Sequence, residues 1–159
     1  MEKIKSFTIN HLTLQSGIYE SRRDPVGNNV VITYDLRITQ PNKEPVLNTA
    51  EIHTIEHLGA TFLRNHPQLK DKIIYFGPMG CRTGFYLLIN GELSHEVLYH
   101  LIHDMFIFIS EFDDEIPGAN VVDCGNGLDH NLAMAKWVAR KYLDRIESIK
   151  NDPFEYEKE

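Results

Sequence analysis

Residues 28–38, NNVVITYDLRI, carry the clearest strand signal in the chain. Branched side chains fill positions 30–33 and Tyr34 follows them, and residues of both kinds are enriched in strands. The run follows a Gly-Asn-Asn turn that starts at Gly27, and turn residues of this kind commonly bound a strand. We therefore predict a strand over 28–38 and assign the other segments around it.

Two further strands are predicted downstream of this one. KIIYFG (72–77) and TGFYLLING (83–91) have the composition of strands, and the PMGC turn (78–81) separates them. Upstream, KSFTINHLTL (5–14) is a candidate edge strand. The residues that come next, GIYESRRD (17–24), are ambiguous.

Capping residues and apolar periodicity predict two helices in the middle of the chain. The first opens at Asn48, which forms a capping-box pattern with Glu51, and it ends near Pro67, because proline disfavours helix at the preceding residue. The second runs from Ser94 to about Ser110. It carries an apolar stripe of helical period, made of Val97, Leu98, Leu101, Ile102, Met105 and Phe106.

A third helix is expected over 129–149, and the last residues, NDPFEYEKE (151–159), are expected to be a frayed, solvated tail. A chain of 159 residues without a repeat or a linker fits one domain, 1–159. Because strands and helices are intermixed and the turns between strands are short, we predict an α+β fold. This fold is a single layered domain with a mainly antiparallel sheet packed against helices.

Charge and composition exclude some classes of function. The formal net charge is −7, without a basic surplus or cluster, which argues against a general binder of nucleic acid or of anionic membranes. No apolar run approaches the ~18 to 20 residues of a membrane span, and MEKIKSFTIN (1–10) lacks a signal core. A cytoplasmic location is therefore expected, where two lone thiols are more often buried, catalytic or metal-bound than paired.

The first predicted helix contains EIHTIEHLGATF (51–62), in which His53 and His57 are four residues apart and Glu56 lies between them. Residues at this spacing share one helical face, so both imidazoles can hold one divalent metal while the carboxylate moves protons. Three polar residues on a solvated face would give the same pattern. The surrounding apolar residues favour the metal site, because histidines on a buried helix need partners.

A catalytic metal usually has three protein ligands and one open position. We prefer Cys124 as the third ligand, since it lies in the glycine-containing VVDCGNGLDH segment (121–130), and His130 competes with it. An inert buried cysteine is the alternative for this position. The pair His100 and His103, three residues apart, is a weaker metal candidate.

Cys81 lies in the tight turn of GPMGCRTG (77–84), just before a predicted strand, so its side chain has a defined position. Arg82 follows it, and a positive neighbour or a metal lowers the pKa of a thiol from about 8.5 towards neutrality. A packing role is the alternative.

Three motifs together resemble the LuxS family, the S-ribosylhomocysteine lyases. They are HTIEHLGATFLRNH (53–66), GPMGCRTGFYL (77–87) and DCGNGLDHNLAMAK (123–136), and the likeness extends over nearly the whole chain. The resemblance implies cleavage of S-ribosylhomocysteine to homocysteine and 4,5-dihydroxy-2,3-pentanedione, the precursor of the autoinducer 2 signals. It also implies a homodimer with active sites at the subunit interface, and one divalent metal per subunit: Fe(II), which Zn or Co can replace.

The resemblance also implies a role for each matching residue. His53, His57 and Cys124 match the metal ligands, and Glu56 and Cys81 match the two acid/base groups. Ser6, His11 and Arg37 match positions that line the substrate pocket. Where members of the family often have an acidic residue before the PMGC turn, this chain has Tyr75 and Phe76.

Two other classes of protein compete with this interpretation. The first is a metallohydrolase, either an inverzincin, which needs a third carboxylate ligand, or a deformylase-like amidase, in which the order of the motifs is reversed. The second is a binding module with a structural metal, which would close all four positions with protein ligands.

Overall fold

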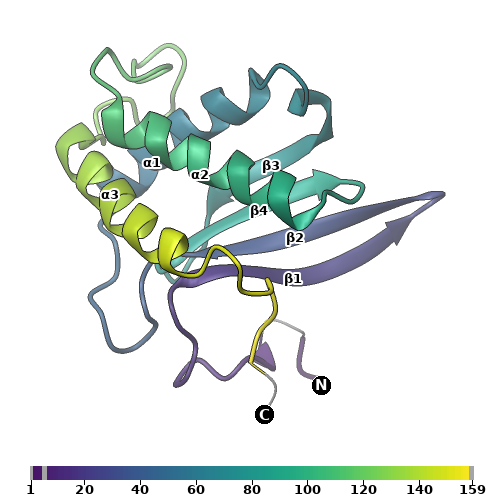
Figure 1. Cartoon of the computed structure of the whole chain (residues 1–159). Coiled ribbons are helices and arrows are strands. Elements are labelled where there is room, and N and C mark those ends of the chain that lie inside the picture. The colour runs from purple at the N-terminus through teal and green to yellow at the C-terminus, as the bar shows by residue number, and fades with distance from the viewer. Residues whose placement is uncertain (1, 5–6, 158–159) are drawn as a thin grey trace.

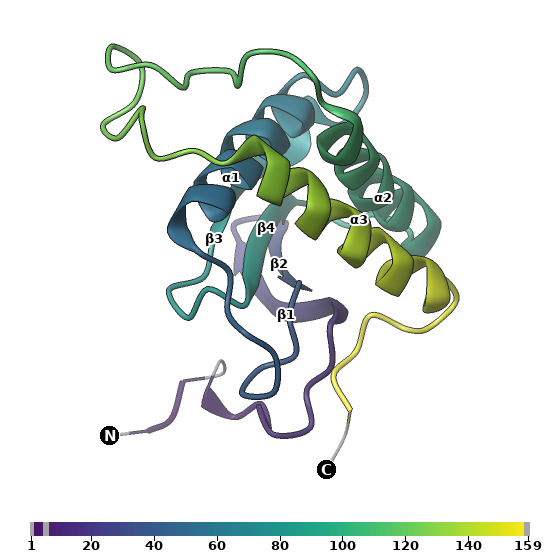
Figure 2. The ribbon, with the colours of Figure 1, turned by 90° about the vertical axis from the view of Figure 1, so that its left-hand side faces the viewer.

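A four-stranded antiparallel sheet and three α-helices make up the computed structural model, which describes residues 2–4 and 7–157. The helices lie together on one face of the sheet, while the N-terminal segment and the last described residues run past β1 (Figures 1 and 2). This arrangement confirms the predicted α+β fold. In chain order, the elements are β1 (Gly17–Val26), β2 (Asn29–Arg37), α1 (Thr49–Arg64), the 3-10 turn η2 (Lys70–Lys72), β3 (Ile73–Pro78), β4 (Gly84–Asn90), α2 (His95–Glu111) and α3 (Leu132–Ser148).

The strand order is β1-β2-β4-β3, so the strand predicted at 28–38 is an inner strand of the sheet. Its register with β4 places Arg37 opposite Gly84. A Cβ added to Gly84 would lie 2.3 Å from the carbonyl oxygen of Leu36, so only glycine lets the two backbones approach this closely. As a result, the end of β2 lies beside the turn that joins β3 to β4.

The core lies between the sheet and the helices. Alternate residues of the inner strands point into it, such as Tyr34 and Leu36 of β2, whereas Asp35 and Arg37 point to the opposite face. The helices contribute their apolar stripes, and the stripe predicted for 97–106 is buried apart from Val97. The core residues of β4 and α2 are Phe85, Leu87, Ile89, Leu98, Tyr99, Leu101, Ile102, Met105, Phe106 and Ile109.

The predicted starts of the first two helices, Asn48 and Ser94, are confirmed. Asn48 is the N-cap of α1. The backbone N–H of Asn48 donates a hydrogen bond to the carboxylate of Glu51 at 2.7 Å. Ser94 caps α2 by accepting from the N–H of Val97 at 3.3 Å. Polar side chains therefore satisfy N–H groups that a helix start leaves unpaired.

The edge strand predicted over 5–14 is wrong for the residues that the structure describes. Residues 7–14 form turns, because Asn10 bonds locally: its side chain accepts from the N–H of Leu12 at 3.0 Å and its carbonyl from Leu14 at 3.1 Å. The edge strand is instead β1, which includes the ambiguous 17–24 segment. A bulge between Glu20 and Arg22 interrupts its alternation, which hid the strand pattern.

The start of the third helix is also corrected. The helix begins at Leu132 and not at Asp129, because Asn131 is its N-cap and accepts from the N–H of Met134 at 3.0 Å. Asp129 lies in a preceding turn, where its N–H donates to the carbonyl of Asn126.

The prediction of a frayed tail is wrong as well. The carbonyl of Phe154 accepts from the N–H of Glu20 at 2.7 Å, and its ring stacks on His95 at 4.1 Å. Tyr156 stacks on Tyr19 with 4.8 Å between ring centroids. Aromatic packing therefore holds the tail along β1 in the described part of the chain. No helix among the described residues has the length and apolar character needed to cross a bilayer.

Candidate active site

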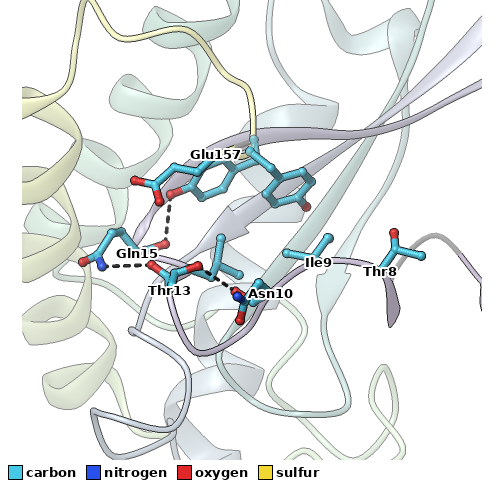
Figure 3. A pocket seen from close by; sticks show the side chains of 9 residues that line it. Thr8, Ile9, Asn10, Thr13, Gln15 and Glu157 are labelled. Carbon is cyan, nitrogen blue, oxygen red and sulfur yellow. Dashed lines mark hydrogen bonds between the residues drawn. The ribbon is translucent and has the colours of Figure 1, made fainter. Parts of the chain in front are cut away.

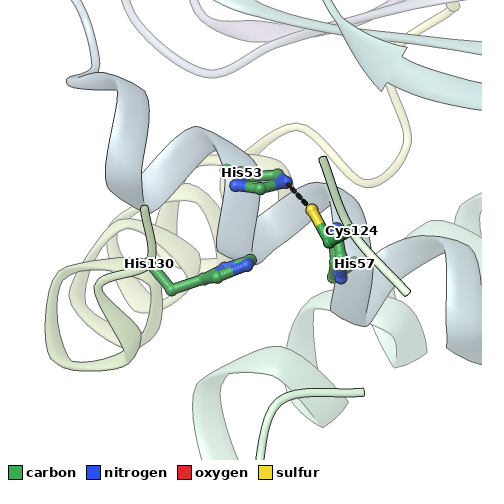
Figure 4. Close-up of side chains that lie close together, drawn as sticks. All are labelled: His53, His57, Cys124 and His130. Atoms are coloured by element: carbon green, nitrogen blue, oxygen red, sulfur yellow. Dashed lines mark hydrogen bonds between the residues drawn. The ribbon is translucent and has the colours of Figure 1, made fainter. Parts of the chain in front are cut away.

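Four side chains converge between α1 and the segment that joins α2 to α3 (Figure 4). His53 and His57 come from α1, and Cys124 and His130 come from the joining segment. One ligand atom from each residue lies within 4.8 Å of the others, and all four residues are half-buried. We call these four residues the imidazole–thiol cluster.

Backbone carbonyls fix how the two α1 histidines present their rings. Nδ1 of His53 donates to the carbonyl of Asp129 at 2.9 Å, and Nδ1 of His57 donates to the carbonyl of Pro117 at 2.7 Å. With the proton on Nδ1, each ring has its lone pair on Nε2. The Nε2 of His53 lies 3.3 Å from the sulfur of Cys124, so this lone pair faces the cluster.

His130 is oriented in the same way by Thr54. The Thr54 hydroxyl donates to the carbonyl of Ala50 at 3.0 Å and accepts from the N–H of Asn131 at 2.9 Å, so it can only accept from Nδ1 of His130, 3.1 Å away. Nε2 of His130 is then unprotonated, and it is buried without a partner among the described residues. Burial, followed by the neighbouring His53 and His57, lowers the pKa of His130, which keeps this ring neutral.

Cys124 is placed by a compact loop. Its N–H donates to the carbonyl of Asn120 at 3.0 Å, and its sulfur accepts from the N–H of Asn126 at 3.4 Å. A Cβ on Gly127 would lie 2.5 Å from the carbonyl carbon of Asn120, so the loop can close this tightly only with glycine there. Gly127 thus lets the loop bring the thiol to the histidines.

The cluster has the donor set of a transition-metal site. Imidazole nitrogens and a thiolate suit Fe(II), Co(II) and Zn(II), and each α1 histidine is held through its other nitrogen, as metal ligands usually are. The buried Nε2 of His130 has no partner among the described residues, and a nearby cation would satisfy it. The described residues therefore fit a divalent metal.

Glu56 lies beside the cluster without being part of it. It lines one hollow with His53, His57 and Pro117, and a second hollow with His53 and the turn that carries Cys81. The residues of that turn in the second hollow are Pro78, Met79, Gly80 and Arg82. Glu56 of α1 and the turn that carries Cys81 therefore line the same pocket.

Cys81 lies in a different electrostatic environment from Cys124. Its sulfur is 3.8 Å from Nη1 of Arg37 and 3.1 Å from the hydroxyl of Thr83. Partial burial acts to raise the pKa of Cys81, but the Thr83 hydrogen bonds and the Arg37 charge outweigh it, so the pKa is lowered. The guanidinium that faces the thiol is that of Arg37, from β2, and not that of the adjacent Arg82 named in the sequence analysis.

Arg37 is itself held by a buried acid. Both side chains are almost fully buried, and Nη2 of Arg37 donates to Oδ2 of Asp35 at 2.6 Å while Nη1 donates to Thr83 at 2.6 Å. The hydroxyl of Tyr156 donates to the same Oδ2 at 2.8 Å. Burial raises the pKa of Asp35, and the Arg37 charge and the Tyr156 hydrogen bond act against this rise. We call Asp35, Arg37, Cys81, Thr83 and Tyr156 the arginine–thiol group.

The described candidates His11 and His103 lie outside both groups. His11 is half-buried in the N-terminal segment, where Nδ1 donates to the carbonyl of Ile9 at 2.9 Å. Ser6 lies outside the described residues. His103 bonds Glu147 at 2.9 Å and is not a member of the cluster.

Sequence reasoning missed Asp35, Thr54, Thr83 and Tyr156. One signal was available: residues two apart on a strand share a face, so the Asp-Leu-Arg triplet of β2 places Asp35 beside Arg37. Nothing local in the sequence indicates that Tyr156 reaches this pair.

Comparison with known proteins gives one consistent family. The family model described as S-ribosylhomocysteinase (LuxS) matches residues 4–152. An S-ribosylhomocysteine lyase of Clostridium acetobutylicum is 54% identical over 156 residues, which cover 98% of this chain and 99% of that protein. Similar proteins of the same name occur in Finegoldia magna, at 58% identity over 156 residues, and in Borreliella burgdorferi, at 50% over 156 residues. Each alignment covers 98% of this chain.

Proposed function

Since the chain belongs to the LuxS family of S-ribosylhomocysteinases, we propose that it cleaves the thioether of S-ribosylhomocysteine to homocysteine and 4,5-dihydroxy-2,3-pentanedione. One observation carries the assignment of roles. His53 and Glu56 line the same hollow as the turn that carries Cys81. A substrate in this hollow would have the metal cluster and Glu56 on one side and the Cys81 turn on the other.

The proposed ligands are His53, His57 and Cys124, with Fe(II) as the native metal and Zn or Co as substitutes. Two imidazoles and one thiolate leave a fourth position for sugar oxygens. When bound, the ion supplies Lewis-acid stabilisation of negative charge on those oxygens.

Cys81 and Glu56 are proposed as the two acid/base groups. The sulfur of the substrate is on C5, whereas the carbonyl of the open-chain sugar is on C1. Proton transfers between neighbouring carbons must move the carbonyl to C3. Loss of a proton from C4 then expels the homocysteine thiolate from C5 by β-elimination. Each transfer needs a group that removes a proton and one that returns it, which suits a thiol of lowered pKa, Cys81, and the carboxylate of Glu56, which lines a pocket with the turn that carries Cys81.

His130 gives specific support to an alternative in which the metal is structural. Its Nε2 would be a fourth protein donor, and four protein donors close a site. Absorption spectra of the cobalt-substituted protein separate the two cases. We expect the spectrum to change when S-ribosylhomocysteine binds, because substrate oxygens take the fourth position. A spectrum that is insensitive to substrate would favour the structural site.

The experiment that tests the proposed function is an anaerobic assay of homocysteine release from S-ribosylhomocysteine, with metal content measured on the same sample. The Glu56→Gln variant should keep its metal and lose about 10²- to 10⁴-fold in rate, which is the usual contribution of general acid–base catalysis. Glu96→Gln, which changes an exposed glutamate in the first turn of α2, should match the parent. Release of no homocysteine by the metal-loaded parent would refute the function.

The substrate contacts and the assembly are also proposals. Ser6, His11 and Arg37 are proposed to bind the substrate. A homodimer is proposed through the sheet face that the helices leave open, because side chains of this face, including Tyr75, Tyr86 and Leu88, surround a hollow there. Sedimentation should then give twice the chain mass of 18.4 kDa.

A cytoplasmic location is proposed as well, since both cysteines are free thiols, the state that a reducing compartment maintains.

A further inference from the structure

The C-terminal tail reaches the arginine–thiol group from outside the region that the family model matches. That match ends at residue 152, and Tyr156 lies four residues beyond it. The tail is fixed by the bond from Glu20 to the carbonyl of Phe154 and by the stack of Tyr156 on Tyr19. These contacts place the Tyr156 hydroxyl 2.8 Å from Oδ2 of Asp35.

Tyr156 also forms a wall of a hollow between the tail and the N-terminal segment (Figure 3). Its other lining residues include Asn10, Gln15 and Tyr19. Burial and the Asp35 carboxylate raise the pKa of Tyr156, so its hydroxyl stays protonated and donates to the acid. The tyrosine therefore separates a buried carboxylate from an accessible hollow.

We propose that Tyr156 is a positioning residue: by donating to Asp35 it keeps the guanidinium of Arg37 turned toward Cys81. Oδ2 of Asp35 has two donors, Nη2 of Arg37 and the Tyr156 hydroxyl. With this acceptor satisfied, Nη1 of Arg37 is available to Thr83 and to the sulfur of Cys81. The importance of this orientation for turnover rests on the proposed function, in which Cys81 moves protons.

The structure also contains the unpaired atoms that a competing arrangement of Arg37 and Asp35 would use. Oδ1 of Asp35 and Nε of Arg37 are both buried without partners among the described residues. A guanidinium can bind both oxygens of a carboxylate through two parallel N–H donors. When the tyrosine hydroxyl is removed, the Asp35 carboxylate loses one hydrogen-bond donor. Arg37 replaces this donor by rotating its guanidinium so that two N–H groups bind both carboxylate oxygens. This rotation withdraws Nη1 from Cys81.

The charged and titratable groups around the thiol are few in the described chain. Arg37 comes from β2, with Asp35 and Tyr156 behind it, and Tyr86 of β4 is close enough for Cys81 to affect its pKa. His11 acts on Asp35 from the N-terminal segment. The hydrogen bonds from Thr83 and then the charge of Arg37 lower the pKa of Cys81, so the orientation of this cation contributes to the reactivity of the thiol.

The test is the pH dependence of Cys81 alkylation by iodoacetamide in the zinc-loaded protein, followed on the Cys81 peptide by mass spectrometry. In Tyr156→Phe the ring stack is kept and the hydroxyl is lost, so the midpoint should rise and alkylation at pH 7 should slow about threefold to tenfold. The kcat for S-ribosylhomocysteine should fall by a similar factor, while zinc content stays the same. Tyr19→Phe is the matched control, because it removes the other hydroxyl of the stack, which bonds Gln15, and its midpoint should equal that of the parent.

A chain that ends at Phe154 gives a second, independent variant, because it keeps the bond to Glu20 and lacks Tyr156. It should show the same slower alkylation. An unchanged Cys81 midpoint in both variants would overturn the proposal. Alkylation needs no substrate, so the two proposals fail separately. A shifted midpoint without any lyase activity refutes only the function, and an unshifted midpoint in an active enzyme refutes only the positioning role.

Discussion

The two cysteines of this chain occupy opposite electrostatic environments. Cys124 faces imidazole nitrogens that carry lone pairs, and its sulfur is 3.3 Å from Nε2 of His53. Cys81 faces the Arg37 guanidinium and the hydroxyl of Thr83. A thiolate among lone pairs needs a cation between them, whereas a thiolate beside a guanidinium already has its counter-charge. The same side chain is thereby suited to binding a metal at one position and to moving protons at the other.

The largest expected effect is a loss of bound metal, which should follow substitution of Cys124 and not of Cys81. Cys124→Ala removes one of three proposed ligands, and we expect bound metal to fall from about one ion per chain to almost none, with loss of lyase activity. Metal analysis after gel filtration measures the change. Full retention of metal would mean that His130 replaces Cys124, and the contrast between the two thiols would no longer hold.

Cys81→Ala tests whether the second thiol acts in catalysis and not in metal binding. The variant should hold as much metal as the parent while homocysteine release falls about 10²- to 10⁴-fold, because a general acid/base is lost and no ligand is lost. The two quantities are measured on one sample. A rate near that of the parent would remove Cys81 from the mechanism.

Arg37→Gln should destabilise the fold as well as the site. The variant leaves the carboxylate of Asp35 buried without its cation, which costs about 3–5 kcal/mol in the free energy of unfolding. Urea denaturation measures this loss. Arg23→Gln removes the exposed ion pairs of Arg23 with Glu20 and Glu92 and should cost no more than about 1 kcal/mol. Equal losses in the two variants would contradict the assignment of a buried pair.

Thr54 and Thr83 allow a finer comparison, because each hydroxyl supports one thiol environment. Thr54→Val removes the acceptor that ties His130 and Asn131, and with them the segment that carries the proposed ligand Cys124, to α1, so we expect metal affinity to weaken about 10- to 100-fold. Competition with a chelator measures the affinity. Alkylation of Cys81 should be unchanged in this variant, and a slower reaction would show that the two environments are coupled.

Thr83→Val should give the smallest effect and the reverse pattern. The hydrogen bond between the Thr83 hydroxyl and the Cys81 sulfur lowers the pKa of Cys81, so its loss raises this pKa and the thiolate fraction at pH 7 falls, while the backbone bond from residue 83 remains. We expect alkylation at pH 7 to slow about threefold to tenfold, with the midpoint moved to higher pH and metal affinity unchanged. A midpoint moved to lower pH would contradict the role given to this hydroxyl.

The sequence predicted one thiol environment better than the other, and the reason is physical. His53 and His57 are four apart on a helix with clear caps, so a local pattern brings them together, and the glycines around Cys124 suggested how a thiol could approach. Arg37 meets Cys81 only through the register of β2 against β4, which pairs Arg37 with Gly84. The local periodicity of a sequence does not determine strand register or long-range contacts.

The two wrong assignments at the chain ends have the same origin. Charged residues and a bulge hid the alternation of β1, and Asn10 turned an apparently strand-like segment into turns. The tail looks polar in sequence, but Phe154 and Tyr156 pack on rings contributed by α2 and β1. Their partners are distant in the sequence, so composition alone predicted a solvated end.

The segment between α2 and α3 makes its contacts with α1 through the residues of the imidazole–thiol cluster and Thr54. His53 holds the carbonyl of Asp129, His57 holds that of Pro117, and Thr54 receives the N–H of Asn131. Because the same two rings would also bind the ion, metal binding would tie this segment to α1 more firmly, so the metal-free protein should be cut by proteases in this segment more readily than the metal-loaded protein.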